Sequence, residues 1–290
     1  MRHLRVVTSL RDKIIPIDGL RKYPRLVHGF TTRSLGNLSF RTSPNGVGRC
    51  RGQMAKELRI NERSMFSIPL GHTNRVAVLE DRSVLDRMDA RGYIPVETVA
   101  VDEFPVITNR IPDPDNIKRY ADGVIWKEPG MYSLVITADC AAVGFYDPVT
   151  GACGNSHVGL LGAVNRLPEG MVQAMVKHFG CRPSDIEVVI YPCIRKCHYD
   201  VSKSMTWQTI KQDVFATYGH DNELYANGHF DLPGMIIEQL AGAGISADHI
   251  HDTGLCTVCH YDGFYSHVGA GTREAQAVEG RFGTVMGLRP

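Results

Sequence analysis

Several features that would place this 290-residue chain in a specialised class are missing. No window approaches the roughly 20 consecutive apolar residues that a membrane span needs. The N-terminal segment 1–16 has neither the continuous apolar core nor the small-residue cleavage site of a secretion signal. The net charge is only +1 and no long basic run stands out, so affinity for a nucleic acid backbone is not expected. We therefore expect a cytoplasmic protein that acts on small molecules and binds neither membranes nor nucleic acids.

The chain has eight cysteines, and without a secretion signal they are better interpreted as thiols than as a disulfide framework. Some of them are therefore available to bind metal. With 43% hydrophobic residues the chain can bury a large core. Neither an internal repeat nor a low-complexity linker is present. We expect one domain over residues 1–290, with an irregular excursion at about 81–116, where charges, prolines and short β-branched runs mix.

Helical and strand-like segments alternate along the chain. Helical spacing or helix-start signals occur at 53–60, 167–179 and 231–244, and Asp231 is a candidate N-cap. Short runs rich in β-branched and aromatic residues predict strands at 132–137, 142–147, 151–158, 186–192 and 263–268. The pattern predicts an α/β or α+β fold with a mixed sheet.

Turn residues at 147–151 (DPVTG) predict a hairpin between two of these strands. Cys140 then lies just before the first strand and His157 near the end of the second, at the same end of the ladder. Thiolate and imidazole together suit zinc or a nucleophile activated by a base. Each residue alone is also compatible with an ordinary buried or hydrogen-bonded side chain. Asp139, beside Cys140, is of a type that can orient a ligand histidine or a substrate.

A second pattern, Cys256-x-x-Cys259-His260, matches the c-type haem attachment motif. Haem is disfavoured because nothing in the sequence indicates export. A zinc knuckle would need a second pair, for which Cys193 with Cys197, or His251, are only loosely placed candidates. We interpret Cys256 and Cys259 as half-buried thiols in a turn before the predicted strand 263–268.

An ordered series of short motifs covers about residues 28–288. It comprises HGFTTR at 28–33, GHT at 71–73, ADG at 121–123, TADC at 137–140, HVGLLG at 157–162, PCIRKCHYDV at 192–201, and CT at 256–257. The series resembles the YfiH-type family of laccase-domain or polyphenol oxidase proteins, which is associated with purine nucleoside phosphorylase and adenosine deaminase activity. The resemblance implies a four-layer αββα sandwich with mixed sheets, similar to the cytotoxic necrotising factor toxins.

The resemblance also implies a site. The family's metal ligands correspond to His72, Cys140 and His157, and three protein ligands with an open fourth position suit a catalytic zinc, which lowers the pKa of a water held there. Zinc is preferred over copper. Catalytic roles fall to Cys140, His157 and Asp139, and the substrates implied are a purine nucleoside with phosphate or water. The substrate contacts implied are Arg33, Tyr199 and Arg281.

The chain departs from the family at positions that matter for phosphate. Leu160 and Leu161 replace a tryptophan and an arginine, Val268 and Gly269 replace paired arginines, and Leu70 replaces a glutamine. Phosphorolysis needs cationic donors, and each lost charge-assisted contact costs a few kcal/mol. The arginines that could substitute are Arg33, Arg51, Arg273 and Arg281.

Four interpretations stay open. The first is a zinc-dependent purine nucleoside enzyme. The second is a zinc-binding family member that binds nucleosides without turnover. The third is a copper polyphenol oxidase, although of 12 histidines only His249 and His251 form the H-x-H pair typical of multicopper sites. The fourth is a cysteine hydrolase with Cys140 as nucleophile and His157 as base.

Overall fold

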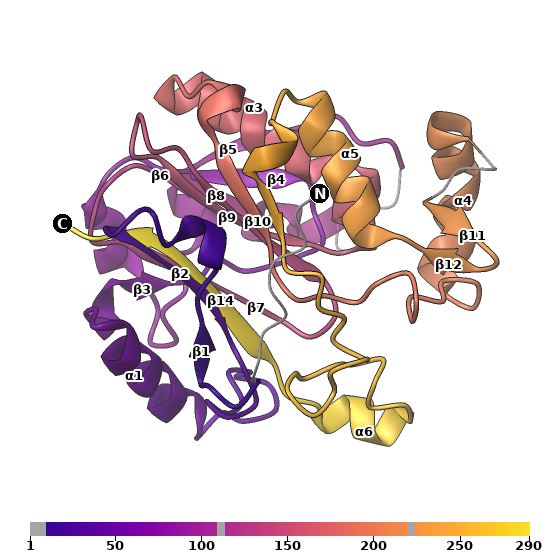
Figure 1. The fold of residues 1–290 in the computed structure, drawn as a ribbon, viewed down its shortest axis with the longest axis horizontal. Helices are drawn as coiled ribbons and strands as arrows, with labels where there is room; N and C mark the ends of the chain where they lie inside the picture. Colours follow the sequence, from indigo (N-terminus) through magenta and orange to yellow (C-terminus); the bar gives the residue numbers. More distant parts are fainter. Residues whose placement is uncertain (1–9, 109–113, 220–223) are drawn as a thin grey trace.

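Two β-sheets lie face to face at the centre of the molecule, and helices cover their outer faces (Figure 1). The computed structural model describes residues 10–108, 114–219 and 224–290. One sheet has, in spatial order, the strands β1 (Ile14–Ile15), β2 (Leu26–Thr31), β14 (Phe282–Leu288), β7 (Tyr132–Thr137) and β3 (Met65–Phe66). The other has β13 (Ile250–Asp252), β10 (Glu187–Ile190), β8 (Ala141–Tyr146), β9 (Cys153–Val158), β6 (Gly123–Trp126), β4 (Arg75–Leu79) and β5 (Ala100–Glu103).

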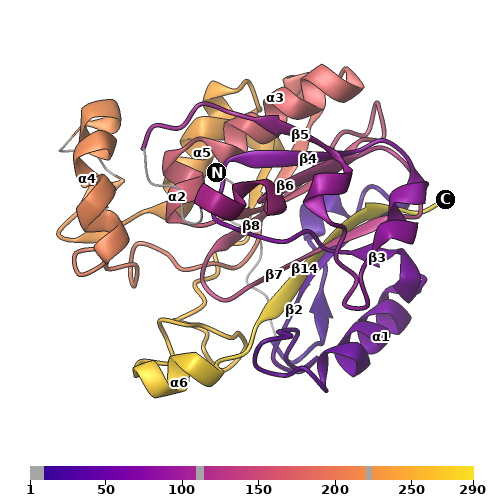
Figure 2. The ribbon, with the colours of Figure 1, turned by 180° about the vertical axis from the view of Figure 1, so that it is seen from behind.

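The helices divide between the two outer faces (Figure 2). Helix α1 (Val47–Leu58) packs on the five-stranded sheet, while α2 (Leu160–Val164), α3 (Leu167–Phe179) and α5 (Leu232–Gly242) pack on the seven-stranded sheet. Helix α4 (Met205–Tyr218), the ribbon β11 (Tyr225–Ala226) with β12 (His229–Phe230), and α6 (Arg273–Val278) lie toward the periphery. Short 3₁₀ helices occupy Asp18–Leu20, Glu62–Ser64, Arg82–Arg87, Val96–Thr98, Pro114–Arg119, Pro183–Asp185 and Ala247–His249.

Three hydrophobic clusters fill the spaces between these layers. One lies between the two sheets and includes Phe30, Trp126 and Phe282. A second joins the seven-stranded sheet to α2, α3, α4 and α5, and a third joins the five-stranded sheet to α1. Because both faces of the central strands are covered, every residue of β8, β9 and β14 is buried. The layers follow the order helix, sheet, sheet, helix, which confirms the predicted αββα sandwich.

Most predicted elements are present. The helix predicted over 167–179 has those bounds, and α5 begins after Asp231, whose carboxylate accepts a hydrogen bond from the Gly234 amide at 3.0 Å. The strand predicted over 263–268 is wrong. Those residues form turns, because the Ser266 hydroxyl and the Val268 amide are directed onto the Asp139 carboxylate instead of a ladder partner.

The region 81–116, predicted to be irregular, contains the 3₁₀ helices at Arg82–Arg87 and Val96–Thr98, and the edge strand β5, which pairs antiparallel with β4. Part of this prediction, residues 109–113, lies outside the described residues. In the ranges that the structure covers, no helix combines the length and apolar character that crossing a membrane requires.

The predicted hairpin β8–β9 is confirmed and fixes the position of the candidate site. The strands pair antiparallel from Ala141 opposite Val158 to Tyr146 opposite Cys153. The Asp147 carboxylate accepts the Val149 amide at 2.8 Å, and Gly151 adopts a φ of 78°, which a glycine tolerates without strain. Strand β6 runs antiparallel to β9, and β4 runs parallel to β6. The segments that precede β4, β6 and β8 therefore meet at the end of β9.

Candidate metal centre

Three side chains converge at this end of the sheet. His72 precedes β4, Cys140 precedes β8, and His157 is the penultimate residue of β9. The ligand atoms of these three residues, called here the three-donor cluster, all lie within 4.8 Å of one another. The two imidazole rings are 5.0 Å apart and nearly perpendicular, at 79°. Two nitrogens and one sulfur that lie this close together match the ligand types that zinc prefers.

A buried carboxylate orients His157. The Nδ1 atom of His157 lies 2.8 Å from Oδ1 of Asp122, which is fully buried. The other Asp122 oxygen accepts hydrogen bonds from the Gly71 amide, the Thr73 amide and the Thr73 hydroxyl, at 3.0, 2.7 and 2.9 Å. An ionised carboxylate can only accept, so it requires the proton on Nδ1 and leaves Nε2 of His157 for a metal.

The backbone around the cluster is unusual. His72 has a φ of 58° and Asp139 a φ of 102°, in the left-handed region that residues other than glycine adopt at a cost. Gly159 closes the site from a third direction. A Cβ added to Gly159 would lie 2.9 Å from Cδ2 of His72 and 3.1 Å from Sγ of Cys140. A larger residue at position 159 would press against the side chains of His72 and Cys140.

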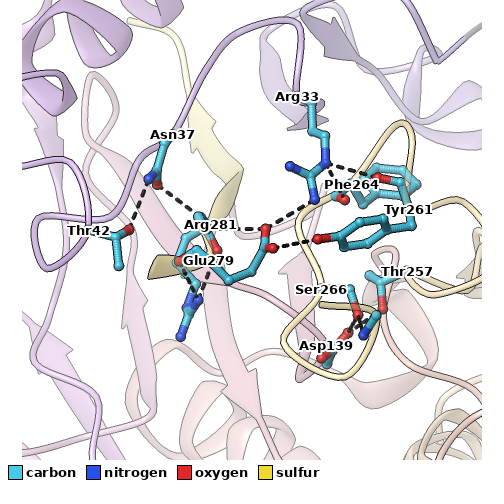
Figure 3. A network of polar contacts seen from close by, with 12 residues as sticks. Arg33, Asn37, Thr42, Asp139, Thr257, Tyr261, Phe264, Ser266, Glu279 and Arg281 are labelled. Carbon is cyan, nitrogen blue, oxygen red and sulfur yellow. Dashed lines mark hydrogen bonds and ion pairs between the residues drawn. The ribbon is translucent and has the colours of Figure 1, made fainter. Parts of the chain in front are cut away.

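Asp139 does not contact His157. Its Oδ1 accepts the hydroxyls of Thr257 and Ser266, each at 2.6 Å, and its Oδ2 accepts the Val268 amide at 2.8 Å (Figure 3). Asp139 thereby holds the loop 257–268 against the segment that carries Cys140. From the sequence, Asp139 was considered only as a carboxylate of a type that can orient a histidine or a substrate, whereas the carboxylate that contacts His157 is that of Asp122. Asp122 lies in the ADG motif at 121–123, directly before β6.

Within the three-donor cluster, Cys140 and His157 shift each other's pKa. Burial raises the pKa of the Cys140 thiol, but the charges of His157 and His72 and their hydrogen bonds outweigh it and bring that pKa down to about 6. Burial lowers the pKa of His157, but the Cys140 thiolate and Asp122 together raise it to about 10. Without metal, the pair is therefore a thiolate next to an imidazolium at neutral pH.

The predicted substrate contacts lie in three different environments. Arg33 is engaged in the protein: its Nε donates to the Tyr261 and Phe264 carbonyls at 2.9 and 2.8 Å, and its Nη2 pairs with Glu279 at 3.1 Å (Figure 3). Its guanidinium also stacks on the rings of Tyr261 and Tyr265. Arg33 therefore has little capacity left for a substrate.

Tyr199 packs edge-on against Phe230, with ring centroids 6.1 Å apart. Burial raises the pKa of its phenol, and the nearby negative charges of Cys140 and Asp139 raise it further. The ring therefore lies within electrostatic reach of the three-donor cluster as a neutral phenol.

Arg281 lines a cavity of about 730 Å³, the size typical of a small-molecule site. The cavity wall reaches Leu70, two residues before His72, and Ile136, four residues before Cys140, and it also includes Arg41. One Arg281 nitrogen donates to the carbonyls of Glu279 and Gly280, and the guanidinium points away from the Arg33–Glu279 pair (Figure 3). Burial lowers the pKa of Arg281, while the charges of Cys140 and Asp139 raise it.

The other arginines considered from the sequence do not line this cavity. Arg51 is buried and donates to the Met65 carbonyl at 2.8 Å, and Arg273 is exposed at the start of α6. Leu160 and Leu161 are 7% and 6% exposed and belong to the core beneath the seven-stranded sheet. The arginines that line the cavity are Arg41, Arg91 and Arg281, and Arg91 is paired with Asp89 at 2.7 Å, so Arg41 and Arg281 are the better candidates for binding phosphate.

The family profile described as multi-copper polyphenol oxidoreductase laccase matches residues 28–289. The chain belongs to this family. In this laccase-domain family, the purine nucleoside phosphorylase LACC1 of Mus musculus is 25% identical over 300 residues, which cover 99% of this chain and 60% of that protein. The purine nucleoside phosphorylase YlmD of Bacillus subtilis is 30% identical over 168 residues, covering 58% and 59%. The chain thus spans about 60% of the length of these curated relatives.

Solved structures of the laccase-domain family share the fold. YfiH of Bacillus licheniformis superposes with a TM-score of 0.72 at 22% identity, over 96% of this chain and 97% of that protein. YlmD of Geobacillus stearothermophilus gives a TM-score of 0.70 at 22% identity, over 92% and 93%.

Proposed function

We propose that the protein is a zinc-dependent enzyme that acts on purine nucleosides in the cytoplasm, by phosphorolysis of adenosine or inosine, deamination of adenosine, or both. The observation that carries the proposal is the three-donor cluster, together with an arginine-lined cavity whose wall reaches Leu70 and Ile136. The relatives described as purine nucleoside phosphorylases supply the substrate class.

The donor set fits zinc. A thiolate and two imidazoles lie within 4.8 Å of one another, and Asp122 fixes the tautomer of His157. When bound, zinc would act as a Lewis acid and lower the pKa of a water held in its open position. Elemental analysis of the purified protein distinguishes zinc from copper, the metal that the family description names.

The residues around the cavity have separate tasks. Arg41, Arg91 and Arg281 provide positive charge on the cavity wall, and Arg41 and Arg281 would bind phosphate and orient it for attack. In phosphorolysis, a phosphate oxygen forms a bond to C1′ of the ribose, the C1′–N9 bond breaks, and its electron pair leaves with the base, which takes up a proton. In deamination, water adds at C6 and ammonia leaves.

A nucleoside-binding protein without turnover is the second candidate. It is favoured by one observation: the family's arginine position holds Leu161, which is buried in the core. Thermal stabilisation by adenosine with no product would support this second candidate and contradict the first.

The test is product analysis of the purified protein with adenosine or inosine, with and without phosphate. We expect free base in the presence of phosphate, or inosine from adenosine. Arg281→Met removes one charge-assisted contact and should lower phosphate-dependent turnover by about 10- to 100-fold. Arg182→Met is the matched control, because Arg182 is an exposed arginine paired with Asp185 on the surface. A zinc-loaded protein that converts no purine nucleoside would refute the proposal.

A further inference from the structure

A second group of metal-binding side chains shares no residue with the three-donor cluster. Cys197 and His198 follow β10, and Cys256 and Cys259 follow β13. Their ligand atoms all lie within 4.8 Å of one another. We call them the four-donor cluster. His198 was not among the candidate metal ligands predicted from the sequence.

The sheet topology explains why these four residues lie close together. Strands β10 and β13 are parallel neighbours, so their carboxyl ends lie at the same edge and the segments that leave them run side by side. The Cys193 amide donates to the Leu255 carbonyl, and the Thr257 amide donates to the Cys193 carbonyl. The Arg195 guanidinium forms an ion pair with Asp252 that fastens the two segments together.

The distances within the four-donor cluster fit a tetrahedral site. Zinc–sulfur bonds of about 2.3 Å and zinc–nitrogen bonds of about 2.0–2.1 Å separate the ligands by roughly 3.8 Å for two sulfurs and roughly 3.5 Å for a sulfur and a nitrogen. The sulfurs of Cys197 and Cys259 are 3.7 Å apart. The Nδ1 atom of His198 lies 3.2 Å from the sulfur of Cys197, 3.5 Å from that of Cys259 and 3.7 Å from that of Cys256.

The cysteines of the four-donor cluster are free thiols, and Cys256 is buried. The sulfur separation of 3.7 Å is far from the ~2.05 Å of a disulfide. Neither Cys193 nor His251 takes part: Cys193 is outside the cluster, and His251 contacts Glu187 at 2.6 Å.

We propose that the four-donor cluster binds a structural zinc ion. Three thiolates and one imidazole complete a tetrahedral shell, which leaves no position for substrate. The site fastens the turn 256–260 to the segment after β10. Within that turn, Thr257 donates to Asp139 at 2.6 Å, next to Cys140. The structural zinc thus supports the three-donor cluster without taking part in its chemistry.

The experiment uses His72→Ala, which leaves the four-donor cluster intact. After anaerobic purification with reductant and reconstitution with zinc, we expect about two zinc ions per wild-type chain and about one per His72→Ala chain. X-ray absorption of the remaining zinc should show a shell with three sulfurs and one nitrogen. A His72→Ala chain without zinc, or with zinc in a shell of one sulfur or none, would overturn the proposal, as would a disulfide between Cys197 and Cys259 in the wild-type protein.

A second variant tests the cluster directly. Cys259→Ser should lose one zinc equivalent and retain the zinc of the three-donor cluster, whereas the control Cys50→Ser, at a half-buried cysteine on α1, should retain both. A Cys259→Ser chain that keeps both equivalents would contradict the proposal. Because metal content is measured separately from nucleoside turnover, failure of this site is distinguishable from failure of the proposed function.

Discussion

Asp122→Asn tests how the three-donor cluster is held together. The substitution keeps the size of the side chain but replaces one acceptor oxygen by an NH₂ donor. The Oδ2 atom of Asp122 accepts three hydrogen bonds from Gly71 and Thr73. The amide oxygen of an asparagine must therefore face Gly71 and Thr73, because only an oxygen can accept these bonds. The NH₂ group then faces Nδ1 of His157, where the carboxylate lay 2.8 Å away.

An NH₂ group at that position requires His157 to accept at Nδ1 and to carry its proton on Nε2, the nitrogen that a metal would use. Loss of such an outer contact typically lowers metal affinity by about 10- to 100-fold, or roughly 1.4–2.7 kcal/mol. We expect a weakening in this range or greater in a competition titration with a zinc-binding dye. In the metal-free proteins, nitrogen NMR of labelled histidine should show both nitrogens of His157 protonated in wild type and Nδ1 unprotonated in the variant.

Asp147→Asn is the matched control. Asp147 is also fully buried, but it accepts the Val149 and Thr150 amides in the turn at the far end of the β8–β9 hairpin. Its substitution should lower stability and leave zinc affinity unchanged. Equal zinc affinities for Asp122→Asn and wild type would refute the reasoning, because the orientation of His157 would then not depend on the carboxylate.

Three further predictions concern the surroundings of the site and the fold. Gly159→Ala places a methyl group 2.9 Å from His72 and should weaken zinc binding by at least ~10-fold. Gly162→Ala is the control, because its added Cβ meets nothing closer than 3.5 Å. Equal zinc affinities of the two variants in competition with a zinc-binding dye would contradict this prediction. In chelator-treated protein, alkylation of Cys140 should rise with pH around a midpoint near 6, because the lowered thiol pKa makes thiolate the main form above it; untreated protein should react slowly, and mass mapping at a series of pH values checks both. The pKa of Glu187 is lowered from 4.5 to about 2, because contacts from His251, Lys22 and Tyr23 outweigh the effect of burial. The charge of Glu187 therefore stabilises the fold above pH 4.5, and this stabilisation is lost as the pH falls toward 2. Glu187→Gln should lower the free energy of unfolding by ~2 kcal/mol at pH 7, and the difference from wild type should become smaller at acidic pH. A difference in the free energy of unfolding that does not change with pH would contradict a stabilising role for the Glu187 charge.

The sequence predicts the hairpin and the end at which Cys140 and His157 meet, because alternation and turn residues are local signals. It does not by itself place His72, which reaches the cluster through the parallel pairing of β4 with β6. Only the family resemblance identified that residue. The contact from Asp122 was missed for the same reason, since its partners Gly71 and Thr73 are about fifty positions away.

The four-donor cluster shows the same limit more strongly. Cys256 and Cys259 carry a recognisable spacing, but their partners Cys197 and His198 are adjacent to each other and show no metal-binding spacing of their own. The parallel pairing of β10 with β13 brings the two pairs together. The predicted strand at 263–268 failed because its apolar and aromatic residues resemble a strand, whereas its polar groups bind Asp139.

The most direct test of the central claim measures zinc content and nucleoside turnover together in His72→Ala. If His72, Cys140 and His157 share one catalytic zinc ion, the variant should contain one zinc fewer per chain than wild type and release neither free base nor inosine from adenosine. A variant that keeps its full zinc content and its turnover would contradict the account.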